Sequence, residues 1–119
     1  MERSIETKCL HLEETEGYTV NYGAISYPIY QTATYAHEGV GKSTGYDYSR
    51  LQNPTREHLE KVVANLENGT DAFAFTSGMA AISLLMELFK PGDHIIVDSD
   101  LYGGCIRLFI NVSEKNGIK

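Results

Sequence analysis

Residues 72–98 read AFAFTSGMAAISLLMELFKPGDHIIVD, and their pattern of apolar residues indicates the class of fold. A short apolar run over 72–76 has the length of a buried strand, and after a tight turn the apolar residues of 80–90 predict a helix. Residues 94–98, His-Ile-Ile-Val-Asp, have the length and the β-branched composition of a second strand. Apolar strands that alternate with helices belong in a parallel sheet with helices on both faces.

Helices are also predicted on both sides of this stretch. Asn53-Pro54 supplies an N-cap with proline at the first helical position, an apolar stripe follows, and Asn68-Gly69 supplies a stop, so we expect a helix over 54–67. A further helix is expected at roughly 104–115. Two strands alone do not make a stable sheet, and the alternation predicts another strand next. We therefore expect an α/β fold of which this chain is the beginning.

The composition excludes several classes of protein. The 119 residues, with a mass of 13.2 kDa, suffice for one small domain, and the net charge of −6 comes without a basic stripe, which argues against nucleic-acid binding. The N-terminus lacks the apolar run of a signal peptide and no segment is long enough to span a bilayer, so we expect a cytoplasmic protein without a membrane partner. Cys9 and Cys105 are expected to be free thiols, and we expect no metal site.

The part of the chain before the first predicted helix differs in composition from the rest. Residues 17–52 contain seven of the eight tyrosines and lack sustained helical or strand periodicity. A long irregular segment rich in tyrosine is typical of a surface that packs on a partner. We therefore divide the chain into an N-terminal arm, 1–53, that contacts a neighbouring subunit, and an incomplete α/β domain, 54–119.

Candidate binding residues follow both predicted strands and also lie in the arm. Ser77-Gly78-Met79 opens a helix, where free N–H groups favour a phosphate, although an N-cap and a tight turn explain the same residues equally well. Tyr102 precedes two glycines that permit close approach of a ligand, but it also fits a loop tyrosine at the sheet edge. In the arm, Arg50 with Tyr48 fits either a phosphate clamp or an ordinary surface pair.

Taken together, these segments resemble a known family. Tyr48-x-Arg50-x-x-Asn53-Pro54-Thr55, Ser77-Gly78-Met79-Ala80-Ala81-Ile82, Gly92-Asp93-His94 and Asp100-Leu101-Tyr102-Gly103-Gly104 occur in the order found in the Cys/Met-metabolism enzymes that depend on pyridoxal phosphate (PLP). The resemblance covers roughly residues 23–109 and is nearest to bacterial cystathionine β-lyases and cystathionine γ-synthases. It implies the N-terminal part of a type I PLP-dependent transferase fold, with a sheet rich in parallel strands.

The resemblance also implies roles for individual residues. The backbone N–H groups of Gly78 and Met79 would bind the cofactor phosphate, and Tyr48 and Arg50 would reach the same phosphate in a neighbouring active site. Such sharing implies a homo-oligomer, at least a dimer, with a tetramer expected from the family.

Two further residues are assigned to the reaction by the same resemblance. Tyr102 would stack on the pyridine ring and assist proton transfer, so it is both a cofactor-binding and a catalytic candidate. Tyr48 and Arg107 would contact the substrate, Arg107 through its distal carboxylate, although Cys105-Ile106 departs from the Ser/Thr-Tyr usual in this stretch. The implied function is carbon–sulfur lyase or γ-replacement chemistry on cystathionine, related sulfur amino acids or activated homoserine, as in methionine biosynthesis.

The family's reactions also need a lysine that forms a Schiff base with the cofactor. In the family this lysine lies downstream of anything that matches residue 119, and the lysines present here lie outside that motif. We therefore expect an N-terminal fragment that is inactive by itself. The alternative is a non-catalytic truncated chain that only associates with other subunits, and a small flavodoxin-like binding domain would need more strands than this chain supplies.

Overall fold

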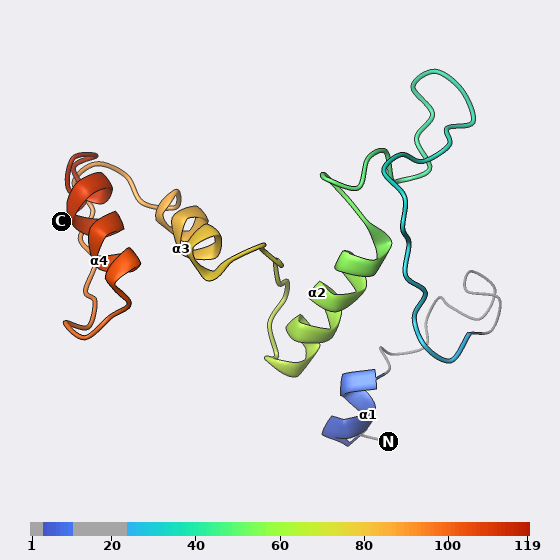
Figure 1. Cartoon of the computed structure of the whole chain (residues 1–119), viewed down its shortest axis with the longest axis horizontal. Coiled ribbons are helices and arrows are strands. Elements are labelled where there is room, and N and C mark those ends of the chain that lie inside the picture. The colour runs from blue at the N-terminus through green and yellow to red at the C-terminus, as the bar shows by residue number, and fades with distance from the viewer. Residues whose placement is uncertain (1–3, 11–23) are drawn as a thin grey trace. The chain divides into compact units, whose positions relative to one another are not determined.

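The computed structural model describes residues 4–10 and 24–119. These residues form α1 (Ile5–Leu10), α2 (Pro54–Leu66), α3 (Gly78–Met86), α4 (Gly103–Leu108) and the π-helix η1 (Phe109–Ser113), as Figure 1 shows for the four α-helices. The chain divides into two compact units, Met1–Ala74 and Phe75–Lys119. No helix within the described ranges has both the length and the apolar character needed to cross a membrane.

Helix α2 confirms the helix predicted over 54–67, including both of its ends. The Asn53 side chain accepts a hydrogen bond from Thr55 N at 2.9 Å, and Pro54 occupies the first turn. At the other end Asn68 has a left-handed backbone (φ 54°), and Gly69 N donates to Ala64 O at 2.8 Å. This is a Schellman ending in which the asparagine, and not the glycine, takes the left-handed position.

Residues 24–53 of the arm contain no helix and no strand. The middle of this segment folds back on itself, because Thr34 and Tyr48 form an isolated antiparallel bridge and Ser49 N donates to Ala33 O at 2.9 Å. The same segment is tied to the start of α2, where Thr55 Oγ1 accepts from Tyr30 N at 2.8 Å and donates to Pro28 O at 3.2 Å. The expected contact with a neighbouring subunit stays a prediction, and residues 1–3 and 11–23 of the arm lie outside the described residues.

Helix α1 was not predicted from the sequence. Ser4 caps it, since Thr7 N donates to Ser4 Oγ at 3.4 Å and Lys8 N to Ser4 O at 3.0 Å, and α1 contacts α2. Its sequence signal is a serine at the cap followed by Glu6 in the first turn. This signal is weak, because the helix has only six residues and none of them is buried.

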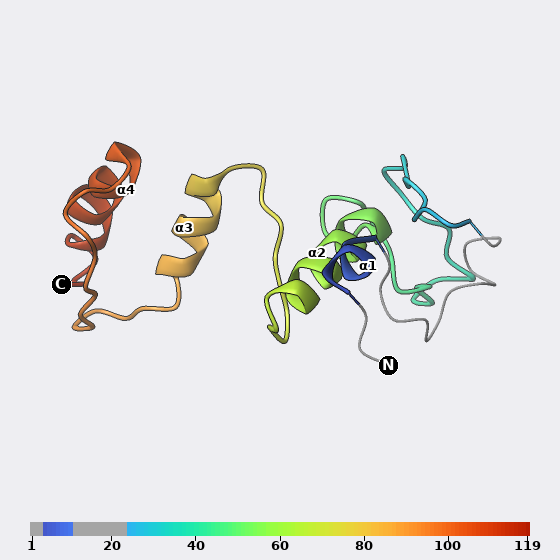
Figure 2. The ribbon, with the colours of Figure 1, turned by 90° about the horizontal axis from the view of Figure 1, so that it is seen from below.

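Helix α3 begins and ends earlier than the predicted range 80–90. Beyond its last residue the bonds tighten to the i to i−3 type, from Leu88 N to Leu85 O and from Phe89 N to Met86 O, both at 3.2 Å. Lys90 N then donates a hydrogen bond to the carboxylate of Asp93 at 2.7 Å. Pro91 disfavours helical backbone in the residue before it, so the helix does not continue. Figure 2 shows α3 followed by a long connection that leads to α4.

The helix expected at roughly 104–115 is present as α4 followed by η1. The change of hydrogen-bond pattern is visible at Glu114 N, which donates five residues back to Phe109 O at 3.0 Å. Cys105, Ser113 and Ile118 are buried, so this segment supplies most of the small core of its unit.

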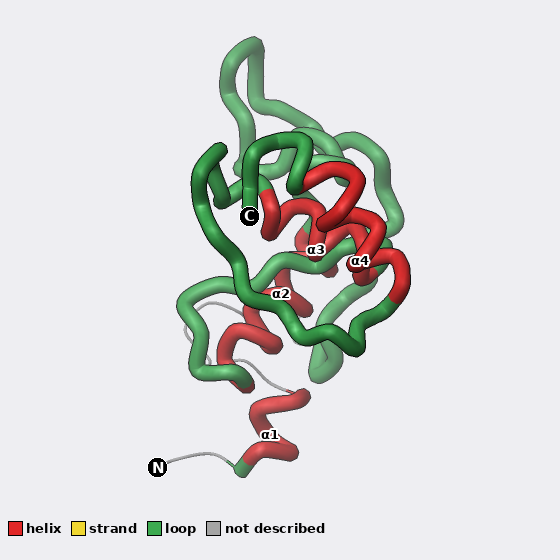
Figure 3. Tube along the Cα trace, turned by 90° about the vertical axis from the view of Figure 1, so that its left-hand side faces the viewer, coloured by secondary structure: helices red, strands yellow, loops and turns green. Residues whose placement is uncertain are grey.

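The two predicted strands, 72–76 and 94–98, are not assigned as strands, and the described residues contain none (Figure 3). Both runs are non-helical, but a strand exists only beside a hydrogen-bonded neighbour. One such pairing begins beside His94, where Lys119 N donates to Asp93 O at 2.9 Å and Ile95 N donates to Lys119 O at 2.7 Å. Bonds from one residue to both neighbours of the opposite residue follow the parallel pattern, while the parallel sheet itself remains a prediction.

Candidate functional site

The N-terminus of α3 presents two backbone donors. Ser77 is the N-cap, because its Oγ accepts from Ala80 N at 3.1 Å, and Ala81 N donates to Ser77 O at 3.2 Å. The N–H groups of Gly78 and Met79 have no partner among the described residues, and a side chain at Gly78 would meet no atom within 4 Å. Ser77 thus serves as a cap, and two donors remain at the positive end of the helix dipole, which suits a phosphate.

Tyr102 lies beside Met79 at the start of α4. A Cβ atom added to Gly104 would lie 2.5 Å from Tyr102 Cε1 and 3.0 Å from Met79 Sδ, so both side chains pack over this glycine. Cys105 Sγ lies 3.8 Å from Met79 Sδ on the buried side. Tyr102 is 70% exposed, which leaves most of its surface available to a ligand.

The structure therefore brings Gly78, Met79 and Tyr102 into one region of the unit Phe75–Lys119. A phosphate donor pair and an exposed aromatic ring next to it match what a pyridine ring with a phosphate arm requires. Arg107 lies on α4, is exposed, and forms no ion pair with any described residue. These residues fit PLP, and Arg107 is available to a carboxylate.

Tyr48 and Arg50 lie in the other unit and contact each other. Arg50 Nη2 lies 3.5 Å from the Tyr48 hydroxyl, and Arg50 Cζ is 5.4 Å from the centre of the Tyr48 ring. The turn that carries them is closed by Leu51 N and Gln52 N, which both donate to Tyr48 O at 2.9 Å. The guanidinium and the phenol are thus held as a pair on an exposed turn, as a shared phosphate clamp requires.

Asn53 makes more contacts than its predicted role as an N-cap needs. While Oδ1 accepts from Thr55 N, Nδ2 lies within hydrogen-bond distance of Ser49 Oγ (3.0 Å), Tyr30 O (3.2 Å) and Tyr35 Oη (3.3 Å). Sequence reasoning missed this cluster, because only the asparagine before a proline gave a signal and its partners lie up to 23 residues away.

Several side chains have shifted pKa values where the arm meets α2. Burial, and then the hydrogen bond to Glu57, raises the pKa of Tyr46. The hydrogen bond from Lys61, and then that from Tyr46, lowers the pKa of Glu57. His58 stacks on Tyr27 with ring centres 3.9 Å apart, and burial lowers its pKa. These groups attach the arm to α2, so we assign them a structural role and not a catalytic one.

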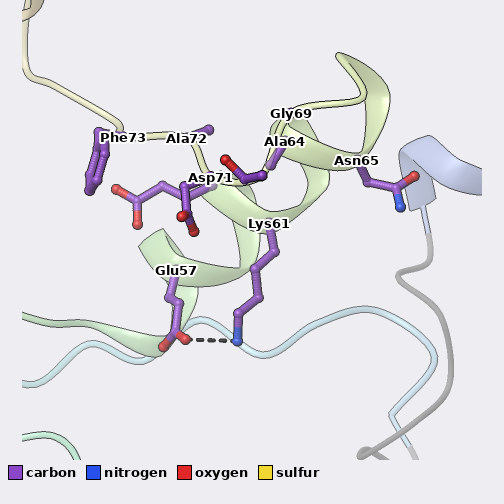
Figure 4. Close-up of a pocket in the computed structure, with 10 residues that line it drawn as sticks. Glu57, Lys61, Ala64, Asn65, Gly69, Asp71, Ala72 and Phe73 are labelled. Carbon is purple, nitrogen blue, oxygen red and sulfur yellow. Dashed lines mark ion pairs between the residues drawn. The ribbon is translucent and has the colours of Figure 1, made fainter.

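A hollow of about 340 Å³ lies beside α2 and contains none of the predicted site residues. Figure 4 shows its polar wall, where Lys61 Nζ pairs with Glu57 at 2.7 Å. The neighbouring carboxylate of Glu60 accepts from Ala74 N at 2.8 Å and pairs with Arg56 at 3.5 Å. Glu57, Glu60 and Lys61 are thus engaged in ion pairs, and we assign the hollow no ligand.

No group of three or more His, Cys, Asp or Glu side chains that could hold a metal ion occurs in the described ranges. The sequence Cys9-Leu10-His11 places two metal-ligand residue types close together, and His11 lies outside these ranges.

Comparison with known proteins gives consistent matches. The family model described as "Cys/Met metabolism PLP-dependent enzyme" matches residues 6–119. A Bacillus subtilis cystathionine gamma-synthase/O-acetylhomoserine (thiol)-lyase is 49% identical over 99% of this chain and 31% of its own length. A Lactococcus lactis cystathionine beta-lyase is 49% identical over 97% of this chain and 30% of its own.

Solved structures agree. Cystathionine gamma-lyase from Lactobacillus plantarum, complexed with L-serine, is 43% identical with a TM-score of 0.82, over 98% of this chain and 30% of its own. Cystathionine gamma synthase from Xanthomonas oryzae, in complex with aminoacrylate and cysteine, is 32% identical with a TM-score of 0.84, over 99% and 30%.

The chain spans about 30% of the length of these relatives. Their names bear out the expected resemblance to bacterial cystathionine β-lyases and γ-synthases, and they do not favour the alternative of a non-catalytic chain. With the family model matched from residue 6 to residue 119, this chain belongs to the Cys/Met metabolism family of PLP-dependent enzymes.

Proposed function

We propose that the whole protein is a transsulfuration enzyme that breaks or forms a carbon–sulfur bond in cystathionine, a related sulfur amino acid or activated homoserine. The observation that carries the proposal is the placement of Met79 and Tyr102 over Gly104, beside the free N–H groups of α3. The names of the relatives support the substrate class, since they are cystathionine lyases and synthases.

Each candidate residue then has a role that its surroundings permit. Gly78 and Met79 bind the phosphate through backbone N–H groups, while Tyr48 and Arg50 clamp the phosphate of a neighbouring subunit. This sharing requires a homo-oligomer, a dimer at least and a tetramer by analogy with the family. Tyr48 and Arg107 bind the substrate, Arg107 by pairing with its distal carboxylate.

When bound, PLP supplies an electron sink that stabilises negative charge developing next to the substrate amine. Tyr102 would lie with its aromatic face against the cofactor ring, and its phenolic oxygen would carry a proton to or from the reacting carbon or sulfur of the substrate. The residue that holds the cofactor covalently is expected beyond the part of the family matched here.

The experiment that tests this function replaces Tyr102 by phenylalanine in the full-length protein. The ring remains and the phenolic oxygen is lost, so we expect cofactor binding to persist while turnover of cystathionine falls by about 100-fold or more. Tyr27→Phe is the matched control, since Tyr27 lies on His58 in the other unit. An unchanged rate in Tyr102→Phe contradicts the assigned role.

A further inference from the structure

The side-chain amide of Asn53 joins three separate parts of the arm. Its Nδ2 lies 3.2 Å from Tyr30 O, 3.3 Å from Tyr35 Oη and 3.0 Å from Ser49 Oγ. Ser49 Oγ passes the connection on by donating to Thr32 O, and it lies 3.3 Å from Tyr35 Oη. All of these groups are polar atoms of a segment without regular structure, so the amide replaces the backbone ladder that a helix or strand would provide.

Ser49 lies between Tyr48 and Arg50, so fixing Ser49 fixes the turn that carries them. Ser49 is held on its backbone as well, because its N–H donates to Ala33 O at 2.9 Å and its carbonyl lies 3.5 Å from Arg56 Nη1. The guanidinium of Arg56 also binds Leu51 O at 2.5 Å. Asn53 and Arg56, at the start of α2, therefore hold this turn through Ser49 and Leu51. The side chains of Tyr48 and Arg50 contact each other and form no hydrogen bond with Asn53 or Arg56.

We propose that Asn53 is a positioning residue, whose amide holds the Tyr48–Arg50 turn in its phosphate-binding geometry before the cofactor arrives. The inference rests on the proposed function, since it assumes that Tyr48 and Arg50 bind the cofactor phosphate. A clamp that is ordered in advance loses less conformational entropy on binding, so its affinity is higher.

The two halves of the amide have separable tasks. Capping of α2 needs only an oxygen that accepts from Thr55 N, and aspartate caps as well as asparagine does. The contacts to Tyr30 O, Tyr35 Oη and Ser49 Oγ use the NH₂ group, which aspartate lacks. Asn53→Asp therefore keeps the cap and places a carboxylate oxygen against the Tyr30 carbonyl, where both are acceptors.

The test uses the full-length protein with Asn53→Asp, and Asn116→Asp as the control. Asn116 is exposed and lies in the unit Phe75–Lys119, so the control repeats the change of charge in the unit that does not contain the turn. The first measurement is hydrogen exchange in the protein stripped of cofactor, at the amides of Leu51 and Gln52, which bind Tyr48 O. The second is the dissociation constant of PLP, followed by its absorbance.

We expect Asn53→Asp to exchange at these two amides about tenfold faster, to bind PLP about tenfold more weakly, and to leave the exchange of the later turns of α2 unchanged. Unchanged exchange at Leu51 and Gln52, or faster exchange with unchanged PLP affinity, overturns the inference. Loss of protection throughout α2 also overturns it, because Asn53 would then act through the helix and not through the turn.

A third variant, Arg50→Ala, separates this inference from the proposed function. If Arg50→Ala binds PLP as tightly as the unaltered protein, the phosphate assignment of Arg50 fails, and the inference falls with it even if Asn53→Asp loosens the turn. If Arg50→Ala weakens PLP binding and Asn53→Asp does not, the phosphate clamp stands and only the positioning role of Asn53 is overturned.

Discussion

The two units of the molecule hold their candidate residues by different means. In Met1–Ala74, the residues Tyr48 and Arg50 lie on a turn that polar side chains fasten to the first turn of α2, with Asn53 at the centre. In Phe75–Lys119, the residues Met79 and Tyr102 lie where two helices begin and are placed by close packing over Gly104. Tyr48 and Arg50 are held by hydrogen bonds of a few side chains. Met79 and Tyr102 can pack as they do because Gly104 has no Cβ atom.

This difference predicts how each region responds to substitution. A polar network loses one bond at a time and yields gradually, whereas a Cβ added at Gly104 meets the side chains of both Tyr102 and Met79, so both must shift. Substitutions in the full-length protein test this difference between the two units.

The largest effect is expected at Gly104. In Gly104→Ala the new Cβ would lie 2.5 Å from Tyr102 Cε1 and 3.0 Å from Met79 Sδ, so the exposed tyrosine ring must move. Because misplacing a reacting group by about 1 Å costs on the order of 100-fold, we expect turnover to fall by about that factor, as measured by steady-state kinetics.

Its matched control is Gly103→Ala at the preceding position. A Cβ there meets no atom within 4 Å, so we expect a loss of less than about threefold. Equal rates for the two alanine variants would show that close packing does not place Tyr102.

The polar side of the contrast is tested by Tyr46→Phe. The Tyr46 hydroxyl donates to the carboxylate of Glu57 on α2, and hydrogen bonds to charged groups contribute about 1.5–3 kcal/mol when buried. Since both side chains are partly exposed, we expect a loss of about 1–2 kcal/mol in the free energy of unfolding, measured by urea denaturation. Tyr27→Phe, which keeps its ring on His58, serves as the control, and an equal loss there would argue against the bond to Glu57.

The same contrast explains which parts of the fold the sequence could predict. Helix α2 was predicted almost to the residue, because Asn53-Pro54 and Asn68-Gly69 are local signals that the structure uses for capping and for the Schellman ending. The two strands could not be confirmed, because a strand is defined by its neighbour, and among the described residues only Lys119 pairs with the backbone on either side of His94. The sequence therefore predicted the elements that are determined by bonds between residues close together in the chain.

For the site, the structure places the side chains of Met79 and Tyr102 together over Gly104, while the roles of Gly78, Met79 and Tyr102 remain predictions. The sequence could not reveal the close approach at Gly104, since Tyr102-Gly103-Gly104 offers two equivalent glycines. Nor could it reveal the contacts of Asn53 with Tyr30 and Tyr35, because an irregular segment has no period from which such contacts can be inferred.

A smaller effect is expected at the end of α2. Asn68 has φ 54°, a conformation that costs an ordinary residue about 1–2 kcal/mol but costs asparagine less and glycine almost nothing. We expect Asn68→Ala to lose about 1 kcal/mol in the free energy of unfolding and Asn68→Gly to lose none. Equal losses in the two variants would mean that the side chain of Asn68, and not its backbone conformation, supports the helix end.

The smallest effect is expected from pH, at the stacked pair of His58 and Tyr27. Burial, and then the nearby charge of Lys61, lowers the pKa of His58 below its ordinary value of 6.5, so the unfolded chain binds this proton more readily than the folded one. His58 therefore contributes stability above pH 6.5 that is lost as the pH falls through its lowered pKa. His58→Phe keeps an aromatic ring on Tyr27 and cannot titrate. We expect the unaltered protein to lose more of its free energy of unfolding than His58→Phe between about pH 7.5 and 5, and parallel losses would show that the stack does not sense the proton.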